Sequence, residues 1–410
     1  MRLVFLFLFL TFSYPYLSFS RVLVGLDRLF TEACFSQQIR GRKVVLISHR
    51  AAINAEGKDA FSIFHANNHH CFLQRLCTLE HGYYGAPAES FNSHLKPKGV
   101  PTVSLYGLHE IPLEVVQDCD VLVYDVQDIG VRSYSFISVL LLLVQASEKY
   151  HKQLIVLDRP NPMGGKVIDG PMPKSQPDNI PKIPYCYGMT PGELALFFKR
   201  MYAPQAEVLV VPMKGWKRSM SFDQTGLVWI PPSPNIPEAQ SSFFYAATGI
   251  IGSLSITNIG VGYTLPFKVI GAPWMDGEFI AKELNKQNLP GISFLPFCYE
   301  PFFGKYKMEM CSGVLLILQD HLKFLPVETL CTILGMIKTH YPKQMAESLS
   351  VINKIPARRA SLCRILGDEQ FLHICQNEPF IIWPLRKLCL EARESFQISR
   401  AAFLLPDYAD

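Results

Sequence analysis

Two apolar runs of this sequence, Val121–Tyr124 and Leu154–Leu157, each end in a cluster of ionisable and amide side chains. The residues of these two clusters are Asp125, Gln127, Asp128, Arg132, Tyr134, Asp158, Arg159 and Asn161. A short apolar run is typical of a buried parallel strand, and open α/β sheets bind ligands at the carboxyl ends of their strands. Carboxylates there can transfer protons and guanidinium groups can bind anions, so the clusters predict a pocket for chemistry. The competing interpretation is a buried ion-pair network that only fixes the loops.

A third cluster, Glu80 and His81, is followed by Gly82 and lies shortly after another apolar segment. A carboxylate beside an imidazole suits a proton donor or acceptor, and glycine lets the backbone approach a ligand closely. Taken alone, this triplet is more often a surface turn. His49, which follows the predicted strand Lys43–Ser48, is expected at a further wall of the same pocket, although a histidine there is more often a structural hydrogen-bonding group.

The sequence lacks the common motifs for dinucleotides, metals and nucleophilic serines. No G-x-G-x-x-G follows the first predicted strand, and neither G-x-S-x-G nor H-E-x-x-H occurs. The 11 cysteines include no C-x-x-C pair, so we expect mainly small buried hydrophobic residues, with one or two disulfides as the alternative. The net charge of +4, without a long basic block, argues against a nucleic-acid groove. We therefore expect no cofactor, no metal and no nucleic-acid partner.

Strand and helix patterns alternate along the first half of the chain. The predicted strands are Lys43–Ser48, Thr102–Tyr106, Asp120–Val126, Gln153–Leu157 and Glu207–Met213, and the predicted helices include Val24–Gln38, Lys58–Asn67 and Tyr134–Tyr150. A further helix is expected after Thr190, with Pro191 in its first turn and Glu193 placed for a capping box. This alternation predicts an α/β fold with βαβ units and a mostly parallel sheet.

The second half of the chain has a more mixed pattern. Short strands are predicted at Ser253–Ile256 and Val314–Leu318, and helices at Glu278–Asn285, Pro326–His340 and Trp383–Glu394. The chain has 410 residues and 49% hydrophobic composition, which is enough for a sizeable core and more than one domain usually needs. Two domains are therefore expected.

The first 20 residues resemble a secretory signal peptide. Arg2 forms a minimal charged region, Leu3–Phe12 is apolar, and Ser18 and Ser20 provide a small-x-small cleavage site before Arg21. The apolar stretch is shorter than the roughly 20 residues of a membrane-spanning helix, although an uncleaved anchor is the alternative. The prediction is export to the periplasm or the exterior, with no stable membrane span after signal removal.

Nine segments, in this order, make the chain resemble the exo-β-N-acetylmuramidase family of the NamZ type. They are Glu80–Gly82, Ser104–Gly107, Asp125–Asp128, Leu157–Pro162, Gly188–Thr190, Val211–Trp216, Pro231–Asn235, Pro266–Phe267 and Ile270–Trp274. The resemblance extends from about Gly25 to Asp320 and more weakly to the C-terminus. It implies a Rossmann-like N-terminal domain at 21–180, extending to about 240, then a smaller mixed α/β domain at 181–410, with the active site in the cleft between them.

The resemblance also implies a function and roles for the clusters. The expected activity is an exo-acting glycoside hydrolase that releases terminal N-acetylmuramic acid from peptidoglycan fragments, so the expected partner is a muramyl saccharide. Glu80 would be the catalytic acid, with Asp125 or Asp128 as the second carboxylate, or the sugar's own acetamido group in its place. The residues expected to bind substrate are His49, His81, Gln127, Arg132, Tyr134, Asp158, Arg159 and Asn161. Of these, Arg132 or Arg159 is expected to pair with the lactyl carboxylate of muramic acid.

One segment, Asn258–Leu265, departs from the family pattern. The family has a glutamate and two arginines where this chain has Ile259, Val261 and Leu265. Losing these charges predicts an altered C-terminal wall of the cleft, with a changed substrate preference or with activity weakened or lost. Two alternatives therefore stay open: a non-catalytic protein of the cell envelope that binds a muropeptide or sugar, and an envelope scaffold with a vestigial cleft.

Overall fold

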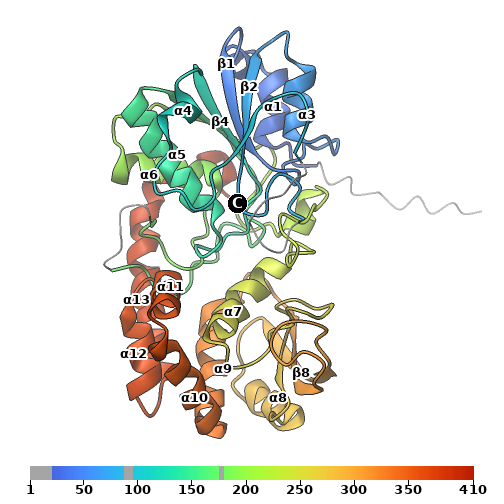
Figure 1. Ribbon diagram of the computed structural model, residues 1–410, viewed down its shortest axis with the longest axis vertical. Coiled ribbons are helices and arrows are strands. Elements are labelled where there is room, and N and C mark those ends of the chain that lie inside the picture. Colours follow the sequence, from blue (N-terminus) through green and yellow to red (C-terminus); the bar gives the residue numbers. More distant parts are fainter. Residues whose placement is uncertain (1–20, 87–95, 175–179) are drawn as a thin grey trace, which may run out of the picture.

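The computed structural model describes residues 21–86, 96–174 and 180–410. The predicted signal peptide lies outside the described residues. Figure 1 shows an upper unit, built around a sheet that contains β1, β2 and β4, and a lower unit that contains α7 to α12. Among the described helices, none combines the length and the apolar character needed to cross a bilayer.

The upper unit contains a sheet of six parallel strands in the order β3-β2-β1-β4-β5-β6. The strands are β1 (Lys43–Ser48), β2 (Phe72–Thr78), β3 (Thr102–Ser104), β4 (Val121–Asp125), β5 (Gln153–Leu157) and β6 (Val208–Val211). This is the strand order of a Rossmann-like fold, in which ligands bind where the order reverses, here between β1 and β4. The predicted α/β class and its Rossmann-like sheet are confirmed, and the sheet continues beyond residue 180.

Helices cover both faces of this sheet. Alternate residues of each strand point to opposite sides, so each face packs against its own set of helices. Val44 and Leu46 of β1 belong to an apolar cluster with α1 (Gly25–Thr31) and α3 (Ala60–Ala66). Val45 and Ile47 belong to the cluster on the other face, which includes residues of α4 (Leu113–Val116), α5 (Phe136–Tyr150) and α6 (Pro191–Tyr202). Both faces are therefore apolar, and polar side chains gather at the ends of the strands.

The predicted start of α6 is confirmed. Thr190 caps the helix by accepting a hydrogen bond from the Glu193 backbone N–H, and the Glu193 side chain accepts one from the Thr190 N–H. Pro191 occupies the first turn, where its missing N–H costs no intrahelical bond. The start of α6 is also bound to the carboxyl end of β5, because the Gly192 N–H donates a hydrogen bond to Asp158, the residue after that strand.

The lower unit combines an antiparallel sheet, β7-β9-β8, with helices. Its strands are β7 (Val269–Ala272), β8 (Ile292–Tyr299) and β9 (Cys311–Leu318). Its helices are α7 (Ser241–Leu254), α8 (Gly277–Lys286), α9 (Pro326–His340), α10 (Pro342–Lys354), α11 (Pro356–Leu366), α12 (Glu369–Asn377) and α13 (Ile382–Arg400). The mixed α/β character predicted for this half is thus present.

One predicted strand of the lower unit is wrong. Residues 253–256 are not extended: Ser253 and Leu254 finish α7, and Ser255 ends the helix in a left-handed conformation with φ of 53°. The apolar residues that suggested a strand instead form the buried side of a 14-residue helix. A short apolar run fits both structures, and here helix length decides between them.

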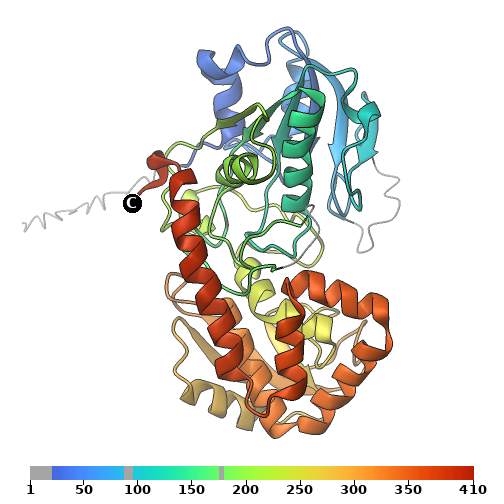
Figure 2. The same ribbon diagram turned by 90° about the vertical axis from the view of Figure 1, so that its left-hand side faces the viewer.

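The C-terminal helix connects the two units. Figure 2 shows α13 rising from the lower unit to the upper unit, where the chain ends beside the parallel sheet. The short turn Pro406–Tyr408 follows, and the buried Tyr408 hydroxyl donates to Asp158 at 2.6 Å. The end of the chain is therefore fastened to the strand ends that the sequence singles out.

Candidate active site

The three polar clusters predicted from the sequence meet at the carboxyl ends of neighbouring strands. Glu80 follows β2, the second cluster follows β4, and Asp158 follows β5. Since the sheet order places β1 between β2 and β4, His49 lies at the end of the strand that joins the clusters. The structure thus brings the predicted residues to one edge of the sheet, but it gives them different environments.

Asp125 and Arg159 form a buried ion pair. Their side chains are 0% and 2% exposed, and the guanidinium donates to both carboxylate oxygens, with the Nη2–Oδ2 distance at 2.9 Å. Burial raises the pKa of Asp125, and the adjacent Arg159 offsets part of that rise. The remaining guanidinium nitrogen donates to the Ile53 carbonyl at 2.7 Å. This pair matches the competing interpretation of an internal network, because neither side chain faces solvent.

Asp158 is a second internal carboxylate. It has no exposed surface and accepts hydrogen bonds from Thr190 Oγ1 and the Gly192 N–H, both at 2.8 Å, and from the Tyr408 hydroxyl. Burial raises its pKa to about 7 despite these donors. Asp158 therefore joins β5, the start of α6 and the C-terminal turn.

His49, Gln127 and Asn161 fix the loops between these carboxylates. The Gln127 N–H donates to His49 Nε2 at 2.9 Å, so His49 is neutral, and burial lowers its pKa to about 3. The Gln127 amide donates to the carbonyls of Asp128 and Pro160. Asn161 donates to the Met189 carbonyl and accepts from the Met163 N–H. All three side chains are at most 3% exposed, so they hold the loops through internal hydrogen bonds and do not face solvent.

Asp128 is slightly less buried than Asp125. Its Oδ2 accepts from the Tyr187 hydroxyl and from the Gly130 N–H, and it is 4% exposed. Burial raises its pKa to about 6, against the lowering effect of these donors. Its other oxygen, Oδ1, has no hydrogen-bond partner among the described residues. Asp128 thus keeps one oxygen unsatisfied, unlike Asp125.

Arg132 connects the two units of the molecule. Its guanidinium donates to the carbonyls of Arg364 and Ile365 in the last turn of α11, at 3.2 and 3.1 Å. Burial lowers its pKa to about 10. Arg132 and Arg159 were the predicted partners of a substrate carboxylate, but the structure uses both guanidinium groups for internal contacts.

Glu80 has the most open environment of the three predicted catalytic carboxylates. It is half-buried, and the Ser135 hydroxyl donates to its Oε2 at 2.7 Å. Ser135 is the residue before α5, so the helix start holds this carboxylate. His81 follows with φ of 66°, a conformation that turns the chain sharply after Glu80.

Two tyrosines, Tyr134 and Tyr245, lie near both Glu80 and Asp128. Tyr134 and Tyr245 pack edge to face with ring centroids 6.2 Å apart, and both interact electrostatically with Glu80 and Asp128. Ser133 lies within hydrogen-bond distance of the Tyr245 hydroxyl, at 3.1 Å. Aromatic walls beside carboxylates suit a sugar ring, which has apolar faces and polar edges.

A cavity of about 520 Å³ is lined by Ser133 and Ser135, whose hydroxyl groups contact Tyr245 and Glu80; Glu80 itself is not among its described lining residues. Its described lining includes Ser133 and Ser135 from the segment before α5, Tyr106 and His109 from the loop after β3, and Arg364 from α11. Residues from both units therefore enclose it, in agreement with a site between them. Its volume lies within the roughly 300–1,000 Å³ typical of small-molecule sites.

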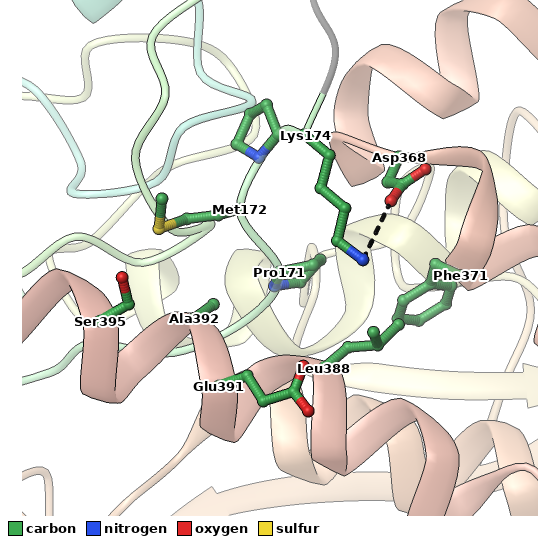
Figure 3. A pocket seen from close by; sticks show the side chains of 10 residues that line it. Pro171, Met172, Lys174, Asp368, Phe371, Leu388, Glu391, Ala392 and Ser395 are labelled. Carbon is green, nitrogen blue, oxygen red and sulfur yellow. Dashed lines mark ion pairs between the residues drawn. The ribbon is translucent and has the colours of Figure 1, made fainter.

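A smaller cavity lies elsewhere on the lower unit. Figure 3 shows it between the segment Pro171–Lys174 and the helices α12 and α13, with Lys174 paired to Asp368 across its opening. Its volume is about 220 Å³, and none of the predicted catalytic or substrate-binding residues lines it. The larger cavity beside Glu80 is therefore the better candidate for the reaction. No cluster of metal-ligating side chains occurs in the part of the chain that the structure describes.

Comparison with known proteins identifies the family. The models for the N-terminal and C-terminal domains of the exo-beta-N-acetylmuramidase NamZ match residues 44–240 and 243–405. The chain belongs to the NamZ family. It is 36% identical over 330 residues to the peptidoglycan beta-N-acetylmuramidase NamZ of Bacillus subtilis (strain 168), covering 79% of both chains.

Solved structures support the same NamZ assignment. A DUF1343 family protein from Bacteroides fragilis aligns with a TM-score of 0.84 and 32% identity over 94% of this chain and 99% of its own. A second protein of that bacterium aligns with a TM-score of 0.67 and 22% identity, over 95% of this chain and 100% of its own, which shows the shared fold alone. The resemblance predicted from nine sequence segments is thereby confirmed, and homology supports a glycoside hydrolase of the muramidase type.

Several residues of this NamZ-family site were not predicted from the sequence. They are Ser133, Ser135, Tyr187 and Tyr245, which contact Glu80, Asp128 or each other. Tyr187 and Tyr245 lie far along the chain from the carboxylates, and no motif marks them. Ser135 is the exception, because a serine before a predicted helix is a recognisable cap position.

The segment that departs from the family pattern, Asn258–Leu265, packs within the lower unit. Ile259 is 7% exposed and lies against Gly252 of α7, so closely that a Cβ on that glycine would be 2.4 Å from Ile259 Cδ1. Val261 and Leu265 are half-buried and pack against apolar clusters. The three apolar residues therefore fill space in the lower unit.

Proposed function

We propose that this protein is an exo-acting glycosidase that releases terminal N-acetylmuramic acid from peptidoglycan fragments. The observation that supports this proposal most directly is the contact of Glu80 with Ser135: Glu80 is a half-buried carboxylate that accepts a hydrogen bond from Ser135, and Ser135 lines a cavity enclosed by both units. The activity named for the Bacillus subtilis relative supports the choice of sugar.

In the proposed reaction, Glu80 protonates the glycosidic oxygen as the bond to the muramic acid ring breaks. The hydrogen bond from Ser135, which lines the cavity, holds one oxygen of the Glu80 carboxyl group. Asp125 takes no direct part, because it is fully buried and paired with Arg159. It maintains the loop that carries Asp128.

The second group in this proposal is the acetamido group of the sugar, oriented by Asp128. Its oxygen bonds to the anomeric carbon as the glycosidic bond breaks, and water then attacks that carbon, returns a proton to Glu80 and releases the sugar. A carboxylate that attacks the sugar carbon needs an open approach, whereas Asp128 is 4% exposed and is held by Tyr187 and Gly130. Its buried Oδ1 has no hydrogen-bond partner among the described residues, and the proposal assigns it the acetamido N–H as its donor. Substrate-assisted hydrolysis of this kind is one of the known variants of glycosidase chemistry.

The test uses a chromogenic β-muramide with wild-type protein and two variants. Glu80→Gln is expected to lower kcat by several orders of magnitude while the circular dichroism spectrum stays unchanged. Glu32→Gln, which alters a half-buried carboxylate that pairs with Arg28 and does not line the cavity, is the matched control and should keep full activity. Turnover by Glu80→Gln at the wild-type rate would remove Glu80 from the role of acid.

The identity of the second group is tested with a muramyl thiazoline, which mimics the intermediate formed by acetamido attack. Strong competitive inhibition of the wild-type protein is expected, together with a weaker effect on Asp128→Asn. A stable covalent sugar adduct on Asp128 would instead identify that residue as the nucleophile.

The alternative function, a binding protein without catalysis, is favoured by the apolar residues Ile259, Val261 and Leu265. Calorimetric binding of a muramide by wild-type protein, without release of sugar in the chromogenic assay, would establish that alternative and reject the enzymatic proposal.

We also propose that the chain is exported after cleavage before Arg21. The supporting observation is the charged, apolar and small-residue pattern of the first 20 residues. Sequencing the N-terminus of protein isolated from its native host tests this: Arg21 is the expected first residue, and a retained Met1 contradicts cleavage.

A further inference from the structure

The larger cavity has a lining suited to an anion. Its described ionisable and hydroxyl-bearing residues are Tyr106, His109, Arg132, Ser133, Ser135, Ser138, Ser361 and Arg364. Two are arginines, four are serines, and none of the described lining residues is acidic. A concave site with this composition favours a ligand that carries negative charge.

Only one of the two arginines is available to a ligand. Arg132 is 4% exposed, its two terminal nitrogens donate to the carbonyls of Arg364 and Ile365, and its buried Nε has no partner among the described residues, so its charge contributes to the field from a buried position. Arg364 is exposed, and its guanidinium has no hydrogen-bond or ion-pair partner among the described residues. The buried Arg132 donates to its carbonyl, so a contact between the units holds the Arg364 backbone at the cavity.

The start of α5 adds to the attraction for anions. Ser135 and Ser138, before and within its first turn, line the cavity. The N-terminal end of this 15-residue helix carries a partial positive charge and free N–H groups. Ser135 also donates to Glu80, so the anion-favouring cavity adjoins the proposed catalytic carboxylate.

We infer that Arg364 is a specificity residue that binds a carboxylate carried by the sugar substrate in this cavity. This inference rests on the proposed function for the identity of the sugar. The carboxylate has two possible sources: the lactyl group of muramic acid itself, or a peptide attached to that group. Arg132 acts as a positioning residue, because it holds the last turn of α11 against the upper unit.

Calorimetry with three ligands tests this inference without requiring catalysis. The ligands are N-acetylmuramic acid, its uncharged methyl ester, and muramoyl dipeptide, in which the lactyl carboxylate is an amide and the charge lies on the peptide. We expect Arg364→Ala to weaken binding of at least one charged ligand by about tenfold or more, as for loss of a charge-assisted hydrogen bond. Binding of the ester should change less than about twofold.

The matched control is Arg359→Ala. Arg359 lies on the same helix, pairs with Glu369 and does not line the cavity. This variant should bind all three ligands as the wild type does. Arg364→Lys should retain part of the affinity for the charged ligand, because a positive charge remains.

The outcomes separate the two sources and the two proposals. A loss confined to N-acetylmuramic acid identifies the lactyl carboxylate, and a loss confined to muramoyl dipeptide identifies the peptide. Equal losses for acid and ester, no loss for either charged ligand, or no binding of any ligand by the wild type would overturn the inference. Wild-type binding that depends on Arg364 without cleavage of a muramide would contradict the proposed enzymatic function and leave the role of Arg364 intact.

Discussion

Replacing Arg159 by methionine should destabilise the protein strongly, because it leaves the Asp125 carboxylate buried without its partner. Asp125 has no exposed surface, and the guanidinium of Arg159 contacts both of its oxygens. Removing one partner of a buried pair costs about 3–5 kcal/mol. The Ile53 carbonyl also loses its donor, which adds about 1 kcal/mol, so the free energy of unfolding should fall by roughly 4–6 kcal/mol near neutral pH.

The loss should depend on pH in a direction set by Asp125. Burial already raises the pKa of this carboxyl group above its ordinary value, and removing Arg159 raises it further. A carboxyl group whose pKa is higher in the folded state contributes stability at low pH and loses it as pH rises through the folded-state pKa. The variant should therefore be closest to wild type in mild acid and furthest from it above neutral pH.

Urea unfolding followed by tryptophan fluorescence, repeated across this pH range, measures both effects. Arg359→Met is the matched control, since its pair with Glu369 is 39% and 64% exposed and should contribute less than about 1 kcal/mol. The double variant Arg159→Met with Asp125→Leu should recover much of the lost stability, because an apolar pair needs no charge compensation. A loss below about 1 kcal/mol, or one that does not change with pH, would refute the reasoning.

The other predictions concern residues around the same strand ends. Tyr408→Phe removes a hydroxyl that donates to the buried Asp158, and urea unfolding should show a loss of about 1.5–3 kcal/mol; unchanged stability would contradict the assigned bond. The pKa of Asp158 is raised to about 7, so its contribution to stability should be present in acid and decline as pH rises through about 7. The thermal midpoint should therefore fall less with rising pH in Asp158→Asn than in wild type. Gly130→Ala should lower the free energy of unfolding by about 1–3 kcal/mol and lower kcat, since Gly130 has φ of 81° and a Cβ there would lie 2.3 Å from Asn161 Oδ1. A variant as stable and active as wild type would argue against this packing. All 11 cysteines are unpaired, so a reducing agent should leave the thermal midpoint unchanged, whereas a lowered midpoint would indicate a disulfide.

The parallel sheet was predictable because its strands are short apolar runs with both faces buried. β1, β4 and β5 begin and end within a residue or so of their predicted limits. β2 was not predicted: its sequence, Phe72–Thr78, includes Gln74 and Arg75, and this interrupts the apolar run. Strand β8 was also missed: its sequence, Ile292–Tyr299, includes Pro296, and proline is uncommon inside strands because it cannot donate to the hydrogen-bond ladder.

The helices at the end of the chain show a second limit of sequence patterns. Pro326–His340 was predicted with its observed bounds, because its apolar residues and first-turn proline agree. The helices α10 to α12 were not predicted, although Pro342 and Pro356 occupy the first turns of α10 and α11, where proline is common. Their position matters for the site, because α11 supplies Arg364 to the cavity.

Sequence motifs at strand ends identify a site, but they do not distinguish the groups that react from the groups that hold the loops in place. Asp125, Asp158 and Glu80 are all carboxylates that follow neighbouring strands, so sequence gives them equal standing. Burial distinguishes them: the first two have no exposed surface and are satisfied by internal donors, whereas Glu80 is half-buried and bonded to Ser135, which lines a cavity. A loop that carries a reactive carboxylate needs neighbours that cannot move, and buried ion pairs and hydrogen bonds provide them. The polar residues at the ends of β4 and β5 therefore make the geometry around Glu80 reproducible.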